Sequence, residues 1–159
     1  MNRVVIVALR ALFGVLMLGL LLIQVVILPV LAAEEAQSFP EVAFLRWPVL
    51  VLAILTVACV QVALVALWAL LTLVEQGQVF SPAAFRHVDV IVAAAVVASA
   101  LVAGTWWYLT LVGGIQQLGL TLMCFGLTCA GVALALLMGV MKALLRQATQ
   151  LTSDLAEVI

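Results

Sequence analysis

The residues best suited to chemistry gather in one polar segment, VEQGQVFSPAAFRHVD, at residues 74–89. It holds the only histidine of the chain, His87, beside Arg86 and close to Asp89. Histidine is the side chain that titrates closest to neutral pH, and arginine can contact the phosphates of anionic lipids. Because Arg86 and Asp89 are three residues apart, they could also pair on a helix. The segment therefore predicts either an interfacial anchor or a pH sensor.

The cysteines do not predict a metal site. Cys59, Cys124 and Cys129 lie in apolar runs and form no C-x-x-C pair. Cys124 and Cys129 would point about 140° apart on a helix of about 3.6 residues per turn. His87 has no cysteine or carboxylate at a usual ligand spacing except Asp89. We therefore expect inert thiols, no metal and no cofactor.

Enzymatic chemistry within a membrane would need a nucleophile beside a base or a metal. Ser99, His87 and Asp89 are of the right types, but Ser99 follows Asp89 by about 15 Å along a helix that rises about 1.5 Å per residue. These side chains cannot meet at one depth. We therefore expect no catalytic residue and no enzymatic activity.

The composition indicates an integral membrane protein. Of the 159 residues, 69% are hydrophobic and 8% are charged, and the mean hydropathy is +1.43. A soluble domain carries about 25% charged residues, so lipid must solvate much of this exterior. The net charge of -1 argues against direct binding of nucleic acid, which requires clustered cationic residues.

Four apolar runs are long enough to span a bilayer, which takes about 20 helical residues. We expect helices at residues 4–31, 47–74, 82–112 and 117–146. Open strands cannot satisfy their backbone groups in lipid, and the runs lack the alternation of a β-barrel. The first run is too long for a cleaved signal peptide. The sequence thus predicts an all-α four-helix bundle in a single membrane domain, residues 1–159.

The cationic residues predict the orientation. Five of the six fall on one side of the spans: Arg3, Arg10, Arg86, Lys142 and Arg146. Only Arg46 falls on the other side, where aromatic residues suited to an interface also gather: Trp47, Trp106, Trp107 and Tyr108. By the positive-inside rule, both termini and the 74–89 segment are cytoplasmic.

The 74–89 segment also has the signals of a helix stop followed by a helix start. Gly77 suits the left-handed conformation after a last helical turn. Ser81 suits the N-cap position and Pro82 the first helical position. Phe80 and Phe85 stand at the two positions of a hydrophobic staple. These five residues predict a structural loop.

Polar and small residues within the spans predict helix contacts. We expect the uncharged polar side chains to form hydrogen bonds between helices: Gln24, Gln61, Thr56, Ser99, Thr105, Thr121 and Thr128. Gln24 and Gln61 could face each other or a small cavity. Small residues at four-residue spacing could join helices of one chain or of two: Ala94, Ala98, Gly131, Ala135 and Gly139.

The C-terminal residues 147–159 predict an amphipathic cytoplasmic extension of the last helix. A seam with coiled-coil spacing runs along it: Leu144, Ala148, Leu151, Leu155 and Val158. Three uses are open: packing under the bundle against the 74–89 segment, self-association into a homo-oligomer, and docking of a cytosolic protein helix. Together with Arg86 and His87, the seam is the candidate partner-binding surface.

The 74–89 segment contains the motif G-x-x-F-S at Gly77, Phe80 and Ser81, and the chain ends with LLRQATQLTSDLAEVI. With its four spans, the sequence resembles YoaS-like bacterial membrane proteins, the domain of unknown function 2975 family. It departs from the relatives at Ala83 and Ala84, where charged residues are more frequent. The resemblance implies a multi-pass protein of the bacterial cytoplasmic (inner) membrane. It also implies a cytosolic helix-turn-helix regulator as partner, since many members are encoded beside one.

Two functions follow as expectations. The first is a non-enzymatic regulatory or signalling protein that engages a cytosolic partner through its inner loop and C-terminal helix. The alternative is a small channel or transporter subunit, or an oligomeric membrane scaffold. A transporter would usually keep an ionisable residue within a span, and no Asp, Glu, Lys or Arg lies near the middle of any span.

Overall fold

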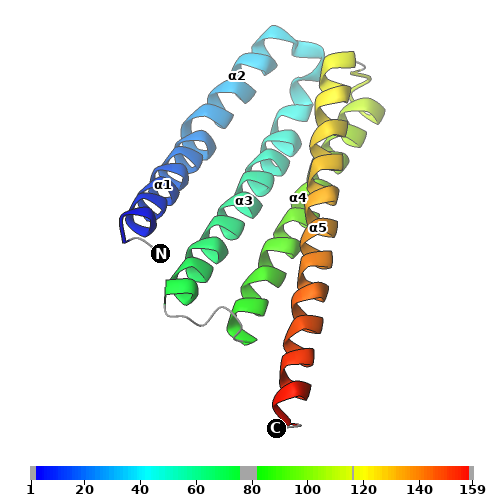
Figure 1. Cartoon of the computed structure of the whole chain (residues 1–159). Coiled ribbons are helices and arrows are strands. Elements are labelled where there is room, and N and C mark those ends of the chain that lie inside the picture. The colour runs from blue at the N-terminus through cyan, green and yellow to red at the C-terminus, as the bar shows by residue number, and fades with distance from the viewer. Residues whose placement is uncertain (1–2, 76–81, 116, 158–159) are drawn as a thin grey trace.

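The computed structural model describes the backbone of residues 3–75, 82–115 and 117–157, and the side chains of that part except at 3, 82, 83, 145, 146 and 148–157. All regular structure in this part is helical (Figure 1). Within it, 4 helical segments are long and apolar enough to cross a membrane: Val4–Ser38, Pro40–Glu75, Ala84–Leu111 and Leu118–Leu144. The predicted fold class is confirmed.

The first span is a composite rod. It consists of α1 (Arg3–Leu22), a π-helical turn η1 (Ile23–Ile27) and α2 (Leu28–Ser38). Pro29 offers no N–H and its ring would clash with a carbonyl one turn earlier, so the wider π turn immediately before it relieves a local conflict. The Leu28 N–H accordingly donates to the Ile23 carbonyl, five residues back.

The helix runs further than the predicted end at residue 31. Residues 32–38, expected in a loop, continue α2 because Ala, Glu and Gln favour helix. A 3-10 turn, η2 (Pro40–Leu45), then reverses the chain into α3 (Arg46–Glu75).

The other two spans are α4 (Pro82–Leu111) and α5 (Leu118–Glu157). Pro82 is the first residue of α4, as predicted. A tight turn joins the two helices: Gly114 has a φ of 63°, a left-handed conformation that glycine adopts without penalty. The Ile115 N–H donates to the Leu109 carbonyl at 3.2 Å and closes the end of α4.

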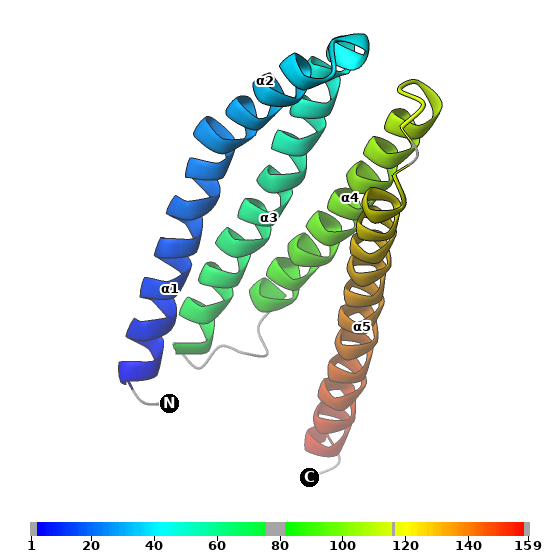
Figure 2. The same cartoon turned by 90° about the horizontal axis from the view of Figure 1, so that it is seen from above.

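The helices stand side by side in chain order, each antiparallel to the next (Figures 1 and 2). The most extensive contacts are those of α3 with α4 and of α4 with α5, whereas α1 packs against α3 over a smaller area. Both termini lie at one end of the molecule, which we call the termini end (Figure 1). The opposite end, with η2 and the turn between α4 and α5, is the turn end.

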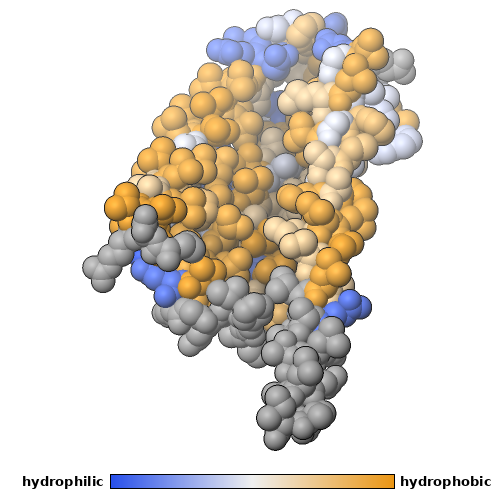
Figure 3. Space-filling model, viewed as in Figure 1, coloured by the Kyte–Doolittle hydropathy of each residue, from blue (hydrophilic) through white to orange (hydrophobic). Residues whose placement is uncertain are grey.

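The apolar core is small for a chain of this size. One cluster joins α1 to α3 through Ile6, Phe13 and Leu71. By contrast, large side chains such as Val4 and Leu118 are 78% and 74% exposed. Figure 3 shows these apolar surfaces along the spans and hydrophilic residues at the turn end. This distribution is that of a protein whose exterior contacts lipid.

Small residues bring α4 and α5 together. A Cβ added to Gly131 would lie 2.0 Å from the Ser99 Oγ, so the two backbones approach closely there. Ala94 and Ala135 are buried nearby, at 8% and 9% exposure. These residues therefore join helices within one chain. Gly139 meets nothing within 4 Å and does not take part.

Candidate functional site

The predicted partner-binding seam lies on a helix, as expected. The apolar span of α5 ends at Leu144, but the helix continues to Glu157. Leu144 is 56% exposed. The backbone of Ala148, Leu151 and Leu155 is helical, while their side chains and the whole of Val158 lie outside the described part.

The extension of α5 does not fold under the other helices. It runs straight past their ends at the termini end (Figure 1). Lys142 on α5 pairs with Asp89 on α4, so these two residues lie at the same level along the helix axes. At about 1.5 Å per residue, Pro82 lies about 10 Å below that level and Glu157 about 22 Å below it. The last two turns of α5 thus project beyond the start of α4. Residues 76–81, against which the first of the three predicted uses would pack the seam, lie outside the described part, so that use stays a prediction.

The predicted inner loop falls largely outside the described residues, since Gly77, Phe80 and Ser81 belong to the undescribed segment 76–81. Beyond it, Phe85 is half-buried in α4.

The polar residues that follow Phe85 differ in exposure. Arg86 is exposed and His87 is half-buried. The expected pair of Arg86 with Asp89 is not the one found, because the Asp89 Oδ1 accepts a hydrogen bond from the Lys142 Nζ of α5. The sequence suggested Arg86, three positions away, as the partner of Asp89, whereas the antiparallel packing brings Lys142 from 53 positions away.

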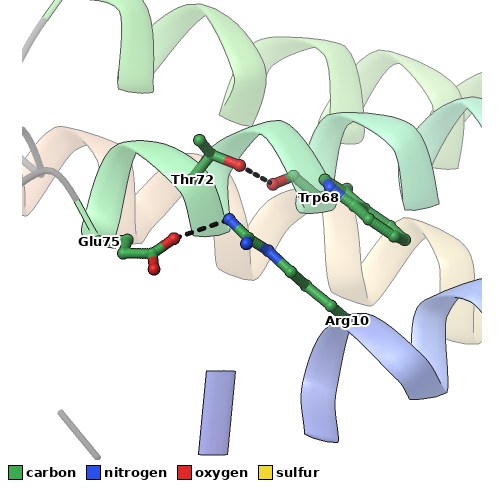
Figure 4. Close-up of polar contacts among 4 residues, drawn as sticks. All are labelled: Arg10, Trp68, Thr72 and Glu75. Atoms are coloured by element: carbon green, nitrogen blue, oxygen red, sulfur yellow. Dashed lines mark hydrogen bonds and ion pairs between the residues drawn. The ribbon is translucent and has the colours of Figure 1, made fainter. Parts of the chain in front are cut away.

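A second ion pair ties α1 to α3 at the same end (Figure 4). The Arg10 guanidinium donates to the Glu75 Oε2 at 2.7 Å. Arg10 stands on the face of α1 that also carries Ile6 and Phe13 of the apolar cluster. Both side chains are more than a third exposed, so such a pair contributes about 0–1 kcal/mol and serves mainly to fix the register of the helices.

Most hydroxyl groups in the spans do not join helices, contrary to expectation. Each donates to the carbonyl four residues earlier in its own helix, as shown by Thr56, Ser99, Thr105 and Thr128. That acceptor is always within reach in a helix, and using it requires no neighbouring helix. Thr121 is the exception, because its Oγ1 accepts from the Trp106 Nε1 at 3.4 Å.

Gln24 and Gln61 do not face each other. The Gln24 Nε2 donates to the Ile54 carbonyl of α3 at 3.0 Å, from within the π turn. Gln61 lies two turns further along α3, and its buried Nε2 has no hydrogen-bond partner among the described residues. The two amides therefore do not line a common path.

The structure adds a site that the sequence did not reveal, a cavity of about 660 Å³ at the turn end. Its apolar wall comes from α2, η2, α3 and the start of α5: Leu28, Leu31, Leu45, Leu50, Ala53 and Leu120. Ligand pockets commonly have volumes of about 300–1,000 Å³ and mostly apolar linings with a few polar groups. Residues so distant in sequence could not be assigned to one cavity without the fold.

Charged residues also line this cavity. They are Glu35 of α2, Glu41 of η2 and Arg46, the first residue of α3. Neither carboxylate forms an ion pair with Arg46 within 4.0 Å. The Arg46 guanidinium carbon lies 5.3 Å from the centroid of the Trp47 ring. The Arg46 Nε is buried and has no hydrogen-bond partner among the described residues.

Metal chemistry gains no support from the described residues. They bring no three His, Cys, Asp or Glu side chains together. Cys59, Cys124 and Cys129 are free thiols.

The comparisons with known proteins point to one family. The family described as "Protein of unknown function (DUF2975)" matches residues 30–159. No curated protein and no solved structure matches the chain.

Proposed function

The chain belongs to the DUF2975 family, and from this premise we propose that it is a non-enzymatic regulatory membrane protein that binds a cytosolic partner through the extension of α5. The partner that the resemblance favours is a small helix-turn-helix regulator. In this proposal the termini end faces the cytoplasm of a bacterial cell, as the distribution of cationic residues predicts.

The observation that carries the proposal is the continuation of α5 as one helix beyond its apolar span, from Leu144 to Glu157. Its last two turns project past the start of α4, and among the described elements α5 packs chiefly against α4. The seam at Leu151 and Leu155 has the spacing that a partner helix can pack against. Two heptads are too short to hold a coiled coil alone, so a partner that supplies further surface is favoured over self-association.

The ion pair of Asp89 with Lys142 supports the same proposal. It anchors α5 to α4 at the point where the extension begins. Because this pair is also partly exposed, it contributes about 0–1 kcal/mol and serves mainly to fix the register at which the extension leaves α4.

The channel or transporter alternative has less support. It would be favoured by a water-filled path near Gln24 and Gln61, but Gln24 donates to the Ile54 carbonyl and the two amides do not face each other. Solute flux into vesicles that contain the purified protein, or an oligomer with a central pore, would support the channel or transporter alternative.

The test is co-purification of the regulator from native membranes with variants of the seam. Leu151→Glu with Leu155→Glu places two charges on the seam, and Ser153→Glu with Ala156→Glu places the same charges off it. We expect the first variant, and a protein ending at residue 146, to lose the regulator at least tenfold. The second variant should retain it.

Membrane insertion is followed in the same samples, because the extension lies outside the spans and all variants should insert equally. If the truncated protein still co-purifies with the regulator at the level of the full chain, the proposal is wrong.

A further inference from the structure

The cavity at the turn end is a candidate ligand site that is independent of the α5 extension. It lies at the depth of an aromatic cluster. Trp106 and Trp107 stack edge to face with their centroids 5.4 Å apart, and Leu109, one turn after Trp106, lines the cavity. Tryptophan gathers at the level of lipid headgroups. The cavity therefore opens where headgroups and acyl chains meet.

Arg46 requires an acceptor that the described residues do not supply. Its Nε is shielded from solvent and lacks a hydrogen-bond partner among the described residues, and an orphaned buried donor is unfavourable because it has lost its hydrogen bonds to water. A guanidinium binds phosphate or carboxylate oxygens in a planar fork. An anionic group at this position would satisfy the donor.

The two carboxylates restrict the choice of anion. Glu35 and Glu41 are exposed residues that line the same cavity, so a purely anionic group would meet two negative charges beside one positive charge. A headgroup that also carries an ammonium group would complement both signs.

The apolar wall of the cavity indicates that the ligand also has a hydrocarbon part. Leucines of three helices form it, among them Leu31, Leu50 and Leu120. Leu45, one of the most buried residues at 3% exposure, closes the cavity against Gly113, where an added Cβ would lie 2.9 Å from the Leu45 Cδ1. A hydrocarbon chain fits this lining, whereas a free headgroup would leave it unfilled.

We propose that the cavity binds one zwitterionic phospholipid of the phosphatidylethanolamine type, with its phosphate on Arg46, its ammonium toward Glu35 and Glu41, and an acyl chain along the leucine wall. The site is thus selective for headgroup charge and is distinct from the general contact of the spans with lipid.

The test is native mass spectrometry of the purified full chain with an equimolar mixture of phosphatidylethanolamine and phosphatidylglycerol. We expect one phosphatidylethanolamine to be retained in preference. Arg46→Gln should weaken its binding at least tenfold, whereas Arg86→Gln, which removes an exposed cation at the termini end, should not. Glu35→Gln with Glu41→Gln should abolish the preference between the two lipids while binding persists.

Filling the cavity gives a second readout that does not depend on charge. Ala53→Trp, within the wall, should displace the lipid, and Ala100→Trp, on the exposed face of α4, should not. Thermal unfolding of each variant checks that it is folded. Equal loss in Arg46→Gln and Arg86→Gln, or full retention in Ala53→Trp, would overturn the proposal. Binding of glycerophosphoethanolamine, which lacks acyl chains, with the affinity of the lipid would also overturn it.

Discussion

Gly131 sets how closely α4 and α5 approach. Its Cα faces Ser99, which is 6% exposed and whose Oγ donates to the Ala95 carbonyl at 2.8 Å. The hydroxyl is therefore held by its own helix, and the space beside it is available only because Gly131 has no side chain. In lipid, where apolar burial between helices adds little, such close backbone packing is a main source of stability.

Gly131→Ala should destabilise the protein by about 1–3 kcal/mol, because the new Cβ would lie 2.0 Å from the Ser99 Oγ. Thermal unfolding in detergent would measure the loss. Gly139→Ala is the matched control, since nothing lies within 4 Å of its added Cβ. Ser99→Ala should relieve most of the loss, because the next contact, with the Ser99 Cβ, is at 3.3 Å. Equal behaviour of the two glycines would contradict this account.

The small-residue pattern could be predicted from sequence, but its partner could not. A four-residue spacing shows that Gly131, Ala135 and Gly139 share a helix face. Which of them meets another helix depends on the height at which α4 and α5 cross, and that height is fixed by a turn of a few residues. Sequence spacing alone therefore does not separate Gly131 from Gly139.

At the scale of elements, the π turn η1 is both an irregularity of the first span and a point where that span contacts α3. Pro29 explains why the turn is there, and the turn carries Gln24, whose amide reaches α3 at Ile54. Since α1 packs against α3 over a limited area, the Gln24 hydrogen bond and the ion pair of Arg10 with Glu75 add to the apolar cluster in setting the position of the first span against α3.

Two glutamine variants test this contact. Gln24→Leu should cost about 0.6 kcal/mol and at most about 1.7 kcal/mol, the mean and the maximum found for hydrogen bonds between membrane helices. Gln61→Leu should be neutral or stabilising, because it removes a buried amide whose Nε2 lacks a partner. Unfolding in a graded denaturing detergent would measure both. A greater loss in Gln61→Leu than in Gln24→Leu would contradict the assignment.

The helices themselves were predictable because length and hydropathy decide them. The start of α4 at Pro82 and the turn at Gly114 also follow from local chemistry. The π turn could not be predicted, because a proline within a span does not show whether the helix will kink, break or form a π turn there. The charged cavity could not be predicted for a related reason. Glu35 and Glu41 fall between the predicted spans 4–31 and 47–74, whereas Glu35 lies on α2 and Glu41 in the turn that leads back to Arg46.

At the scale of the whole molecule, the two ends differ in what they offer. The termini end carries two ion pairs between helices and a projecting amphipathic helix. The turn end carries the cavity with Arg46 and two carboxylates. The proposed functions assign a cytosolic protein to the first end and a lipid headgroup to the second, so both depend on which side of the membrane each end faces.

The most direct measurement of this dependence is thiol labelling in intact cells with a membrane-impermeant maleimide. In a chain whose three cysteines are replaced by alanine, Gln37→Cys places a thiol at the turn end and Gln147→Cys places one at the termini end, both at exposed positions. The account predicts that Gln37→Cys is labelled in intact cells and that Gln147→Cys is labelled only after the membrane is permeabilised. Labelling of Gln147→Cys in intact cells, with Gln37→Cys protected, would contradict it.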